Sequence, residues 1–291
     1  MKNNQNNALS WLDKDEYPFH GKYFPLPMWK MHYLDEWNGD PILMVHGNPG
    51  WSFEYRNIVK ELSKTHRCIV PDHIGFWLSD KPYDWDYLPT HQAENLEELL
   101  DTLDLTNITL IVSDWGWPIG LSYVIKHPEK FKKIIILNTW LWSLKQDYYY
   151  RIFSAVMGGF MGRFMIKYFN IFGKLVVPKA MGNVSRLTTT IHEHYYKHLE
   201  TSESRKWCYT FPKEIINSSE WLDDLWGQRE TLKNIPTTII WWMKDIAFRE
   251  KELNYWIDNW HDAKVVRLKN VGHYPQEESP ETIIEEVKSS Q

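Results

Sequence analysis

The sequence is poor in cysteine: its 291 residues include only Cys68 and Cys208. Two cysteines so far apart supply neither a disulfide framework nor the closely spaced ligand pairs of a structural zinc site. So few cysteines without a pairing pattern are typical of a protein from a reducing compartment. We therefore expect a cytoplasmic protein.

Long apolar runs and targeting signals are also missing. The longest uncharged apolar stretch, residues 152–162, ends at Arg163 and is too short to cross a bilayer. Residues 1–7 are polar and lack the apolar segment of a signal peptide, so we expect a short disordered tail there. We predict no membrane insertion.

Clustered positive charge is absent as well. The chain has 33 Lys and Arg against 38 Asp and Glu, a formal net charge of −5, and no stripe of basic residues stands out. Nucleic-acid binding needs such a basic surface, so no nucleic-acid partner is expected. No repeat or low-complexity tract is found either, and the sequence leaves the oligomeric state open.

Short apolar strands alternate with helical stretches through most of the chain. Strands are predicted at 41–45, 67–70, 108–112, 133–137, 237–241 and 265–268. Leu96, Leu99, Leu100 and Leu103 recur at the spacing of one helix face. Alternation of this kind predicts an α/β fold, in which helices cover both faces of a mostly parallel sheet.

The pattern changes after residue 138. Residues 139–227 are rich in aromatic and methionine side chains at helical spacing and have few strand signals. We predict a core at 1–138 and 228–291, with an inserted helical cap at 139–227 whose boundaries are approximate. Ligands of open parallel sheets bind beyond the carboxyl ends of the strands, so the site is expected under this cap.

The most informative stretch is a strand that ends on an acid, Asp114, followed by Trp115 and a glycine. Pro118 suits the first turn of the helix that follows, which is predicted over 121–126. A tight turn from strand to helix, the nucleophile elbow, raises one side chain above the sheet and points the next backbone N–H groups at the atom it attacks. Asp114 in that place forms an ester of its carboxylate. The alternative is an Asp that only caps the helix.

Three further groups follow predicted strands. The tetrapeptide His-Gly-Asn48-Pro comes after the first strong strand, Asp245 after a late one and His273 after the last. An acid at an elbow, a second acid and then a histidine is the chain order of an α/β-hydrolase triad. Asp72 and His73 are interpreted as a structural turn.

Nine motifs carry a family resemblance over nearly the whole chain. They are Met31-His-Tyr-Leu-Asp-Glu36, His46-Gly-Asn-Pro49, Trp51-Ser-Phe-Glu-Tyr-Arg56, Pro71-Asp-His-Ile-Gly75, Ser79-Asp-Lys-Pro82, Asp114-Trp-Gly116, Asn138-Thr-Trp140, Met243-Lys-Asp245 and Gly272-His273. In order and spacing the chain resembles the haloalkane dehalogenases of the α/β-hydrolase fold. The branch also contains the β-lactone decarboxylases of olefin biosynthesis.

The resemblance implies that Asp114 is the nucleophile, His273 the base that activates water, and Asp245 the carboxylate that orients this histidine. Asn138 stands where some relatives carry the triad acid. An amide cannot hold a charge there, which favours Asp245.

On the same resemblance, the reaction cleaves the carbon–halogen bond of a small apolar haloalkane and releases alcohol and halide. The side chains of Asn48 and Trp115 would hold the halide, since both are neutral donors. Their backbone N–H groups would form the oxyanion hole. No metal or organic cofactor is implied.

Three alternatives stay open at this point. A β-lactone decarboxylase can use the same Asp114 and anion-binding groups, but it releases carbon dioxide and an olefin. An epoxide hydrolase shares the Asp-Trp-Gly elbow, but it needs tyrosines of the cap as acids and has no need of Asn48. The third alternative is an inactive homologue. Chain-length preference is also left open.

Tryptophan occupies five positions where the resemblance leads us to expect glycine: Trp29, Trp37, Trp77, Trp117 and Trp242. Overpacking costs roughly 1–3 kcal/mol per site, so five such sites approach the whole stability of a domain. We hypothesise that the source organism reads one codon as glycine and that this translation reads it as tryptophan. The alternative is true divergence, in which Trp77 and Trp117 fill the pocket and lower the activity.

Overall fold

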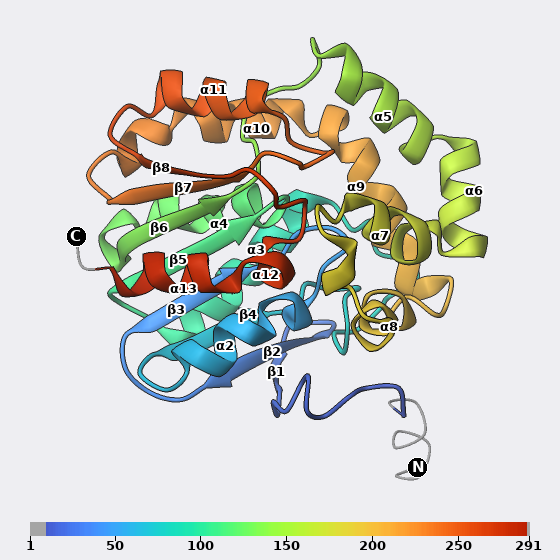
Figure 1. Cartoon of the computed structure of the whole chain (residues 1–291), viewed down its shortest axis with the longest axis horizontal. Coiled ribbons are helices and arrows are strands. Elements are labelled where there is room, and N and C mark those ends of the chain that lie inside the picture. The colour runs from blue at the N-terminus through green and yellow to red at the C-terminus, as the bar shows by residue number, and fades with distance from the viewer. Residues whose placement is uncertain (1–9, 290–291) are drawn as a thin grey trace.

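The computed structural model describes residues 10–289, so the tail expected at 1–7 lies outside the described residues. Its strands are β1 Lys22–Pro25, β2 Lys30–Glu36, β3 Pro41–Val45, β4 Arg67–Pro71, β5 Ile108–Ser113, β6 Phe131–Leu137, β7 Thr237–Trp242 and β8 Lys264–Leu268. They form one sheet in the order β1-β2-β4-β3-β5-β6-β7-β8 (Figure 1). The strands β1 and β2 were not among those predicted.

Most of the sheet is parallel. β1 pairs with β2, and β2 with β4, in antiparallel register, whereas all other neighbours are parallel. Val45, Val112 and Ile136 lie side by side in the register of β3, β5 and β6. The carboxyl ends of these strands therefore meet at one edge, where the predicted site residues follow them.

Helices cover both faces of the sheet, as Figure 1 shows. Outside the segment between β6 and β7 they are α2 Arg56–Leu62, α3 Pro89–Leu103, α4 Gly116–Lys126, α11 Glu250–Asn259, α12 Pro275–Glu278 and α13 Pro280–Lys288, with the turns η1 Ser52–Tyr55 and η2 Pro128–Lys130. α3, α4 and α11 share one apolar cluster with Val45 and Leu110, and α2 and α13 share the other with Met44 and Ile111. The central strands thus bury both of their faces.

The segment between β6 and β7 is helical and contains no strand in the described chain. Its helices are α5 Tyr148–Gly158, α6 Phe160–Phe169, α7 Val177–Ala180, α8 Thr189–Lys197, α9 Lys206–Asn217 and α10 Ser219–Gly227, with the shorter turns η3 Phe172–Val176, η4 Val184–Arg186, η5 Glu203–Arg205 and η6 Arg229–Leu232. This confirms the predicted α/β-hydrolase class with an inserted helical cap. The residue at which the cap ends stays a prediction. The last of these helices, α10, packs against the core helix α4. No helix within residues 10–289 is both long and apolar enough to cross a membrane.

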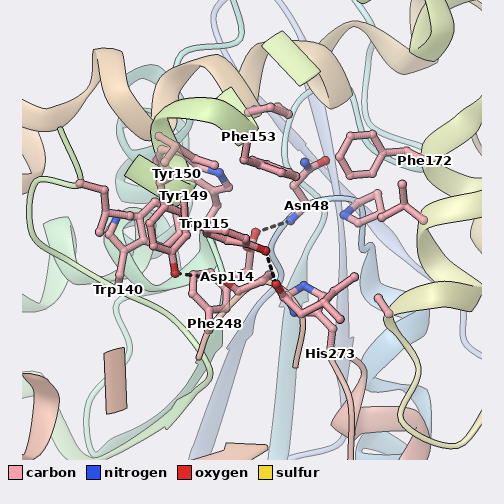
Figure 2. Close-up of a pocket in the computed structure, with 18 of the residues that line it drawn as sticks. Asn48, Asp114, Trp115, Trp140, Tyr149, Tyr150, Phe153, Phe172, Phe248 and His273 are labelled. Atoms are coloured by element: carbon pink, nitrogen blue, oxygen red, sulfur yellow. Dashed lines mark hydrogen bonds between the residues drawn. The ribbon is translucent and has the colours of Figure 1, made fainter. Parts of the chain in front are cut away.

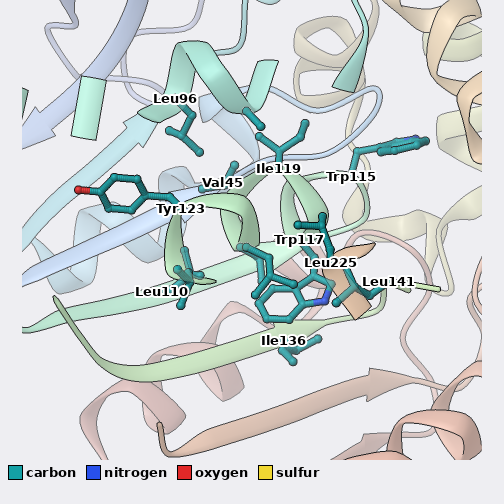
Figure 3. Close-up of a cluster of buried hydrophobic side chains, with 14 of the residues drawn as sticks. Val45, Leu96, Leu110, Trp115, Trp117, Ile119, Tyr123, Ile136, Leu141 and Leu225 are labelled. Atoms are coloured by element: carbon teal, nitrogen blue, oxygen red, sulfur yellow. The ribbon is translucent and has the colours of Figure 1, made fainter. Parts of the chain in front are cut away.

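The contact between α4 and the sheet is close. An added Cβ at Gly116 would lie 2.1 Å from the carbonyl oxygen of Val45, so only glycine fits there. Figure 3 shows Trp117, the next residue, packed among Ile136, Leu141 and Leu225. Trp117 is fully buried, and its indole N–H has no hydrogen-bond partner within the described residues. A buried donor without a partner is a cost to the fold.

Two of the five unexpected tryptophans have backbone angles that favour glycine. Trp37 has a φ of 70° and Trp77 a φ of 40°, in the left-handed region that side chains with a Cβ rarely adopt. Trp37 is also largely exposed to solvent, where a tryptophan gains little from burial. Both observations support the glycine hypothesis at these two positions. Nothing comparable marks Trp29 or Trp242.

The coding DNA gives a direct check of this hypothesis. We expect one shared codon at Trp29, Trp37, Trp77, Trp117 and Trp242, and a different codon at Trp51, Trp115 and Trp140. One codon common to all eight positions would rule the hypothesis out. Protein purified from the source would then show the mass of tryptophan rather than of glycine in the peptides that contain the five positions.

Candidate active site

Asp114 occupies a sharp turn between β5 and α4. Its φ is 49°, a left-handed conformation that is uncommon for a residue with a side chain. Two contacts hold the turn: the Asp114 N–H donates to the carbonyl of Asn138 over 3.1 Å, and the Thr139 hydroxyl donates to the Asp114 carbonyl over 2.6 Å. Backbone strain that is fixed in this way is a feature of functional sites. The predicted elbow is present in the structure.

The Asp114 carboxylate faces two backbone donors. The Asn48 N–H donates to Oδ1 over 2.8 Å, and the N–H of Trp115 also faces the carboxylate. Gly47 permits this approach, because a Cβ there would lie 2.4 Å from the Asp114 side chain. Burial raises the pKa of Asp114, while His273 and the two N–H groups oppose the rise.

His273 pairs with Asp245, as the sequence predicted for the last histidine and the late acid. The Nδ1 atom of His273 lies 2.9 Å from Asp245 Oδ2. Asp245 also accepts from the Ala247 N–H over 2.7 Å and from the Asn138 amide over 2.9 Å. The Asn138 side chain therefore orients the acid, and the other imidazole nitrogen is left for chemistry.

The charges around His273 control its protonation. Burial by itself would lower the pKa of this imidazole, but Asp245, Asp114 and Glu54 together raise it to about 9. At neutral pH the free protein therefore holds His273 as a cation between acids. Loss of one neighbouring negative charge would lower this pKa again.

The carboxylate of Asp114 opens into an apolar cavity under the cap. The sheet side contributes Asn48, Trp115, Trp140 and His273, and the cap contributes side chains such as Phe153 and Phe172 (Figure 2). A cavity of this kind favours apolar substrates and strengthens any hydrogen bond made inside it.

One residue that lines this cavity, Trp140, carries a further buried donor that was not predicted. The Trp140 indole N–H is buried without a hydrogen-bond partner in the part of the chain that the structure describes, and the ring meets Trp115 edge to face at 4.8 Å. The sequence named Trp140 only within a motif, because strand ends alone do not tell which tryptophan turns toward the cavity.

A second, small polar cavity lies next to Asp114 and His273, and nothing in the sequence predicted it. Glu54, Ser113 and Gln276 line it as well. Its volume is about 10 Å³, which is close to the room of one water molecule. The Gln276 amide nitrogen lies 3.3 Å from both Glu54 Oε1 and Ser113 Oγ, while its carbonyl oxygen is buried without a partner in residues 10–289. Burial raises the pKa of Glu54 well above its ordinary value.

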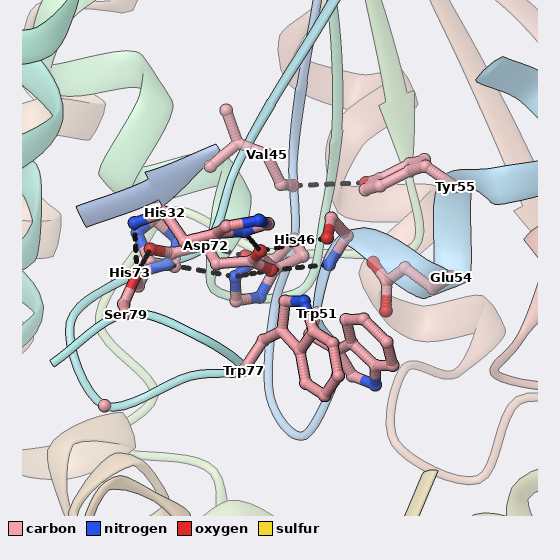
Figure 4. Close-up of polar contacts among 12 residues, drawn as sticks. His32, Val45, His46, Trp51, Glu54, Tyr55, Asp72, His73, Trp77 and Ser79 are labelled. Atoms are coloured by element: carbon pink, nitrogen blue, oxygen red, sulfur yellow. Dashed lines mark hydrogen bonds and ion pairs between the residues drawn. The ribbon is translucent and has the colours of Figure 1, made fainter. Parts of the chain in front are cut away.

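Asp72 lies outside both cavities and joins three parts of the fold, as Figure 4 shows. Its carboxylate accepts from the Ser52 N–H over 2.6 Å and from the Ser52 hydroxyl over 2.9 Å. The His32 ring contacts it at 2.6 Å. These contacts are internal to the fold, in keeping with the interpretation of Asp72 as part of a structural turn. The described residues contain no cluster of three or more His, Cys, Asp or Glu that could hold a metal ion.

Comparison with known proteins agrees with this architecture. Residues 40–280 match the model of the alpha/beta hydrolase fold family. The chain is 34% identical over 270 residues to a cis-3-alkyl-4-alkyloxetan-2-one decarboxylase of Shewanella oneidensis, covering 89% of this chain and 84% of that protein. It is 33% identical over 275 residues to haloalkane dehalogenase 2 of Mycobacterium tuberculosis, covering 93% of this chain and 94% of that protein.

Solved structures of similar shape include haloalkane dehalogenases. A single-residue variant of haloalkane dehalogenase DatA from Agrobacterium tumefaciens superposes with a TM-score of 0.83 at 21% identity, over 94% of this chain and 98% of that one. Haloalkane dehalogenase DbeA from Bradyrhizobium elkani superposes with a TM-score of 0.80 at 22% identity, over 92% of this chain and 96% of that one. At this level of identity the structural match supports the fold.

Proposed function

The chain belongs to the α/β hydrolase family, where it is an enzyme similar to haloalkane dehalogenases and β-lactone decarboxylases, and we propose that it cleaves carbon–halogen bonds through an ester of Asp114. One observation carries the proposal. A carboxylate on a strained elbow faces an apolar cavity, with two backbone N–H donors and a His273–Asp245 pair beside it. This is the arrangement that nucleophilic catalysis by a carboxylate requires.

In the first step, an oxygen of Asp114 attacks the carbon that bears the halogen, and the halide departs with the bonding electrons. The Asn48 amide and the Trp115 indole are the proposed donors to the departing anion. Both are neutral, so neither lowers the nucleophilicity of Asp114 as a cation would. The apolar lining keeps water away and strengthens these contacts.

In the second step, His273 removes a proton from water, which attacks the ester carbonyl, and the alcohol leaves with the oxygen that Asp114 had donated. Ester formation removes the negative charge of Asp114, one of the groups that raise the pKa of His273. The pKa of His273 therefore falls once the ester has formed, and the imidazole can act as the base of the second step. Asp245 then stabilises the imidazolium, and the N–H groups of Asn48 and Trp115 hold the oxyanion.

The small polar cavity beside Asp114 and His273 is the proposed place of the hydrolytic water. Such a water can donate one hydrogen to His273 and the other to the unpartnered carbonyl oxygen of Gln276, so that a lone pair points at the ester. Burial raises the pKa of Glu54, while the nearby His273 opposes this rise.

Gln276→Met tests this water site. We expect hydrolysis of the ester to slow about 5- to 100-fold, the effect of losing one buried hydrogen bond, while the first release of halide keeps its rate. Glu54→Gln is the matched control, because an amide of the same shape can keep the contact with the Gln276 amide nitrogen. Rapid-quench measurement of both steps gives the answer. Equal slowing of both steps in Gln276→Met, or a larger effect of Glu54→Gln, would contradict this assignment.

The halide site gives a further prediction. Asn48→Ala and Trp115→Phe should each weaken inhibition of turnover by bromide by about 1–3 kcal/mol, the loss expected for a hydrogen bond to a charged group. Saturable quenching of tryptophan fluorescence by bromide is a second, smaller signal. Phe153→Leu changes the cavity wall without touching a donor and serves as the control. Equal bromide inhibition in the wild type and the two donor variants would reject the site.

A second candidate reaction is decarboxylation of a β-lactone. The similarity to the Shewanella decarboxylase over most of both chains favours it, and the apolar cavity suits two alkyl chains as well as a haloalkane. Purified protein offered a panel of brominated alkanes and a long-chain cis-β-lactone in parallel separates the two. Bromide and acid would mark the dehalogenase, and an olefin would mark the decarboxylase.

Epoxide hydrolysis is less well supported than these two reactions. The cap residues Tyr149 and Tyr150 line the cavity, but each hydroxyl donates its hydrogen to a backbone carbonyl, that of Ile246 over 2.5 Å and that of Ala247 over 2.9 Å. Neither is therefore placed to protonate an epoxide. The other alternative is an inactive homologue. Turnover of any brominated alkane or of the β-lactone in that panel would exclude it.

A further inference from the structure

The outer side of the cap carries large apolar side chains that face solvent. On α5 and α6 these are Ile152, Val156, Phe160, Met161, Phe164 and Tyr168, which we call the aromatic face. Phe160 is 85% and Met161 66% exposed, and the rings of Phe164 and Tyr168 are in contact at 4.9 Å. Apolar patches of this extent on a protein surface mark interaction sites.

The two helices are arranged so that this face points outward. The buried residues of α5 are Tyr150, Ser154 and Gly158, of which the last two lie against Lys213 of α9. On α6 the buried residues are Gly162 and Ile166. An ordinary surface helix places its large apolar residues inward and its polar ones outward. The helices α5 and α6, which Figure 1 shows at the outer edge of the molecule, depart from this pattern because they also carry large apolar side chains on their exposed side.

The stretch of chain that carries the aromatic face has charges of one sign. Residues 148–192 contain six cations and no Asp or Glu, whereas the whole chain has a net charge of −5. The cations are Arg151, Arg163, Lys167, Lys174, Lys179 and Arg186. None of them forms an ion pair with an acid anywhere in residues 10–289. An apolar surface with unpaired cations is complementary to an apolar layer covered by anions.

The helix α5 and the turn η3 lie between the outer surface of the cap and the active-site cavity. Phe153 of α5 and Phe172 and Val176 of η3 line the cavity, while the neighbours Ile152 and Leu175 are exposed on the outside. Figure 2 shows Phe153 and Phe172 above the opening that leads to Asp114. A molecule dissolved in an apolar layer against the aromatic face would have only the thickness of the cap to cross.

We propose that the aromatic face docks on the surface of an anionic lipid bilayer, and that the cap takes its apolar substrate from there. The second half of this statement rests on the proposed function, and the docking itself does not. The bilayer is favoured over a second copy of the chain, because a symmetric pair through this face would bring two sets of unpaired cations together. Docking needs no spanning helix, since side chains of the face reach only the boundary between headgroups and acyl chains.

Cosedimentation of the purified full chain with vesicles tests the docking. We expect binding to vesicles of phosphatidylglycerol and phosphatidylcholine in equal parts, weaker binding at high salt, and little binding to phosphatidylcholine alone. Arg151→Glu with Lys179→Glu should lower the affinity by about 25-fold or more, since each cation near an anionic surface contributes about fivefold. Phe160→Ser with Met161→Ser should lower it by about tenfold or more.

Matched controls come from parts of the molecule away from α5 and α6. Arg267→Glu with Lys269→Glu makes the same charge change on and after β8, and Met28→Ser removes an exposed apolar side chain between β1 and β2. Both should bind vesicles like the wild type. All four variants should keep the wild-type melting temperature and the wild-type rate on a short, water-soluble bromoalkane, because none of these residues lines the cavity.

Three results would overturn the proposal: no binding to anionic vesicles at low salt, an equal loss of binding in the charge-matched control, or self-association that Phe160→Ser with Met161→Ser abolishes while vesicle binding is unchanged. The last result would assign the face to contacts between copies. Vesicle binding is measured without substrate, so a protein that binds vesicles but releases neither bromide nor olefin would reject the proposed function and leave the docking intact.

Discussion

Asp114→Asn is expected to reduce turnover by on the order of 10⁴- to 10⁶-fold, the range seen when a nucleophile or its activation is removed from an enzyme. A neutral amide cannot displace a halide, whereas its shape and its contacts with the Asn48 and Trp115 N–H groups are close to those of the carboxylate. Substrate binding should therefore stay measurable. Steady-state bromide release, together with binding of a non-reactive alkane analogue, separates the two effects.

The control for this variant is the mass of its Asp114 peptide. Deamidation of the introduced asparagine would restore the nucleophile slowly, so the mass must show that the amide is intact. Ser122→Ala, a change on α4 whose hydroxyl donates only to the Pro118 carbonyl, should keep most of the activity. More than a trace of turnover with the amide intact would reject Asp114 as the nucleophile.

His273→Phe is expected to stop the second step and spare the first. Halide release should stop after one equivalent per protein, because the ester forms but no base activates the water. The fold should tolerate the change, since Asp245 keeps two donors, the Ala247 N–H and the Asn138 amide, and the ring of Phe248 already packs near His273. Rapid-quench measurement of bromide gives the amplitude and rate of this burst.

The same variant distinguishes a base from a structural histidine. If His273 only held the loop in place, its loss would lower both steps alike, and no burst would be seen. His91→Phe, a change at a surface histidine of α3, is the control and should turn over normally. The lactone reaction need not share the two-step dependence, so an unchanged rate of olefin formation in His273→Phe would favour that reaction.

Much of the fold could be predicted because its strands are buried on both faces. The sequences of β3, β5 and β7 are nearly continuous β-branched or apolar runs, and these predict parallel strands directly. β1 and β2 were missed because they are antiparallel edge strands of mixed polarity, with exposed residues at several positions. α4 begins at Gly116, earlier than the predicted 121, because its first turn is part of the elbow and depends on contact with Val45.

The site residues that could be predicted are those that come shortly after a predicted strand. Asp114, Asp245 and His273 each come shortly after a strand, and the topology brings them together. Glu54 lies on η1 and Gln276 on α12, and neither residue directly follows a strand. They come into contact only through the tertiary packing, which the sequence pattern does not reveal.

The basic surface of the cap was missed for a related reason. Its cations are spaced among aromatic residues, so no stretch of sequence looks like a basic cluster. They stand on several short elements of the cap rather than in one run, from Arg151 on α5 to Arg186 on η4.

The central claim, an ester on Asp114, is tested most directly by the fate of oxygen in a single turnover. Wild-type protein in excess over a bromoalkane, in water enriched in ¹⁸O, should yield alcohol without label, because its oxygen comes from the Asp114 carboxylate. The label should be found in the Asp114 peptide, since water attacks the ester carbonyl. Label in the alcohol of this first turnover, with an unlabelled Asp114 peptide, would mean that water attacks the substrate directly and would contradict the account.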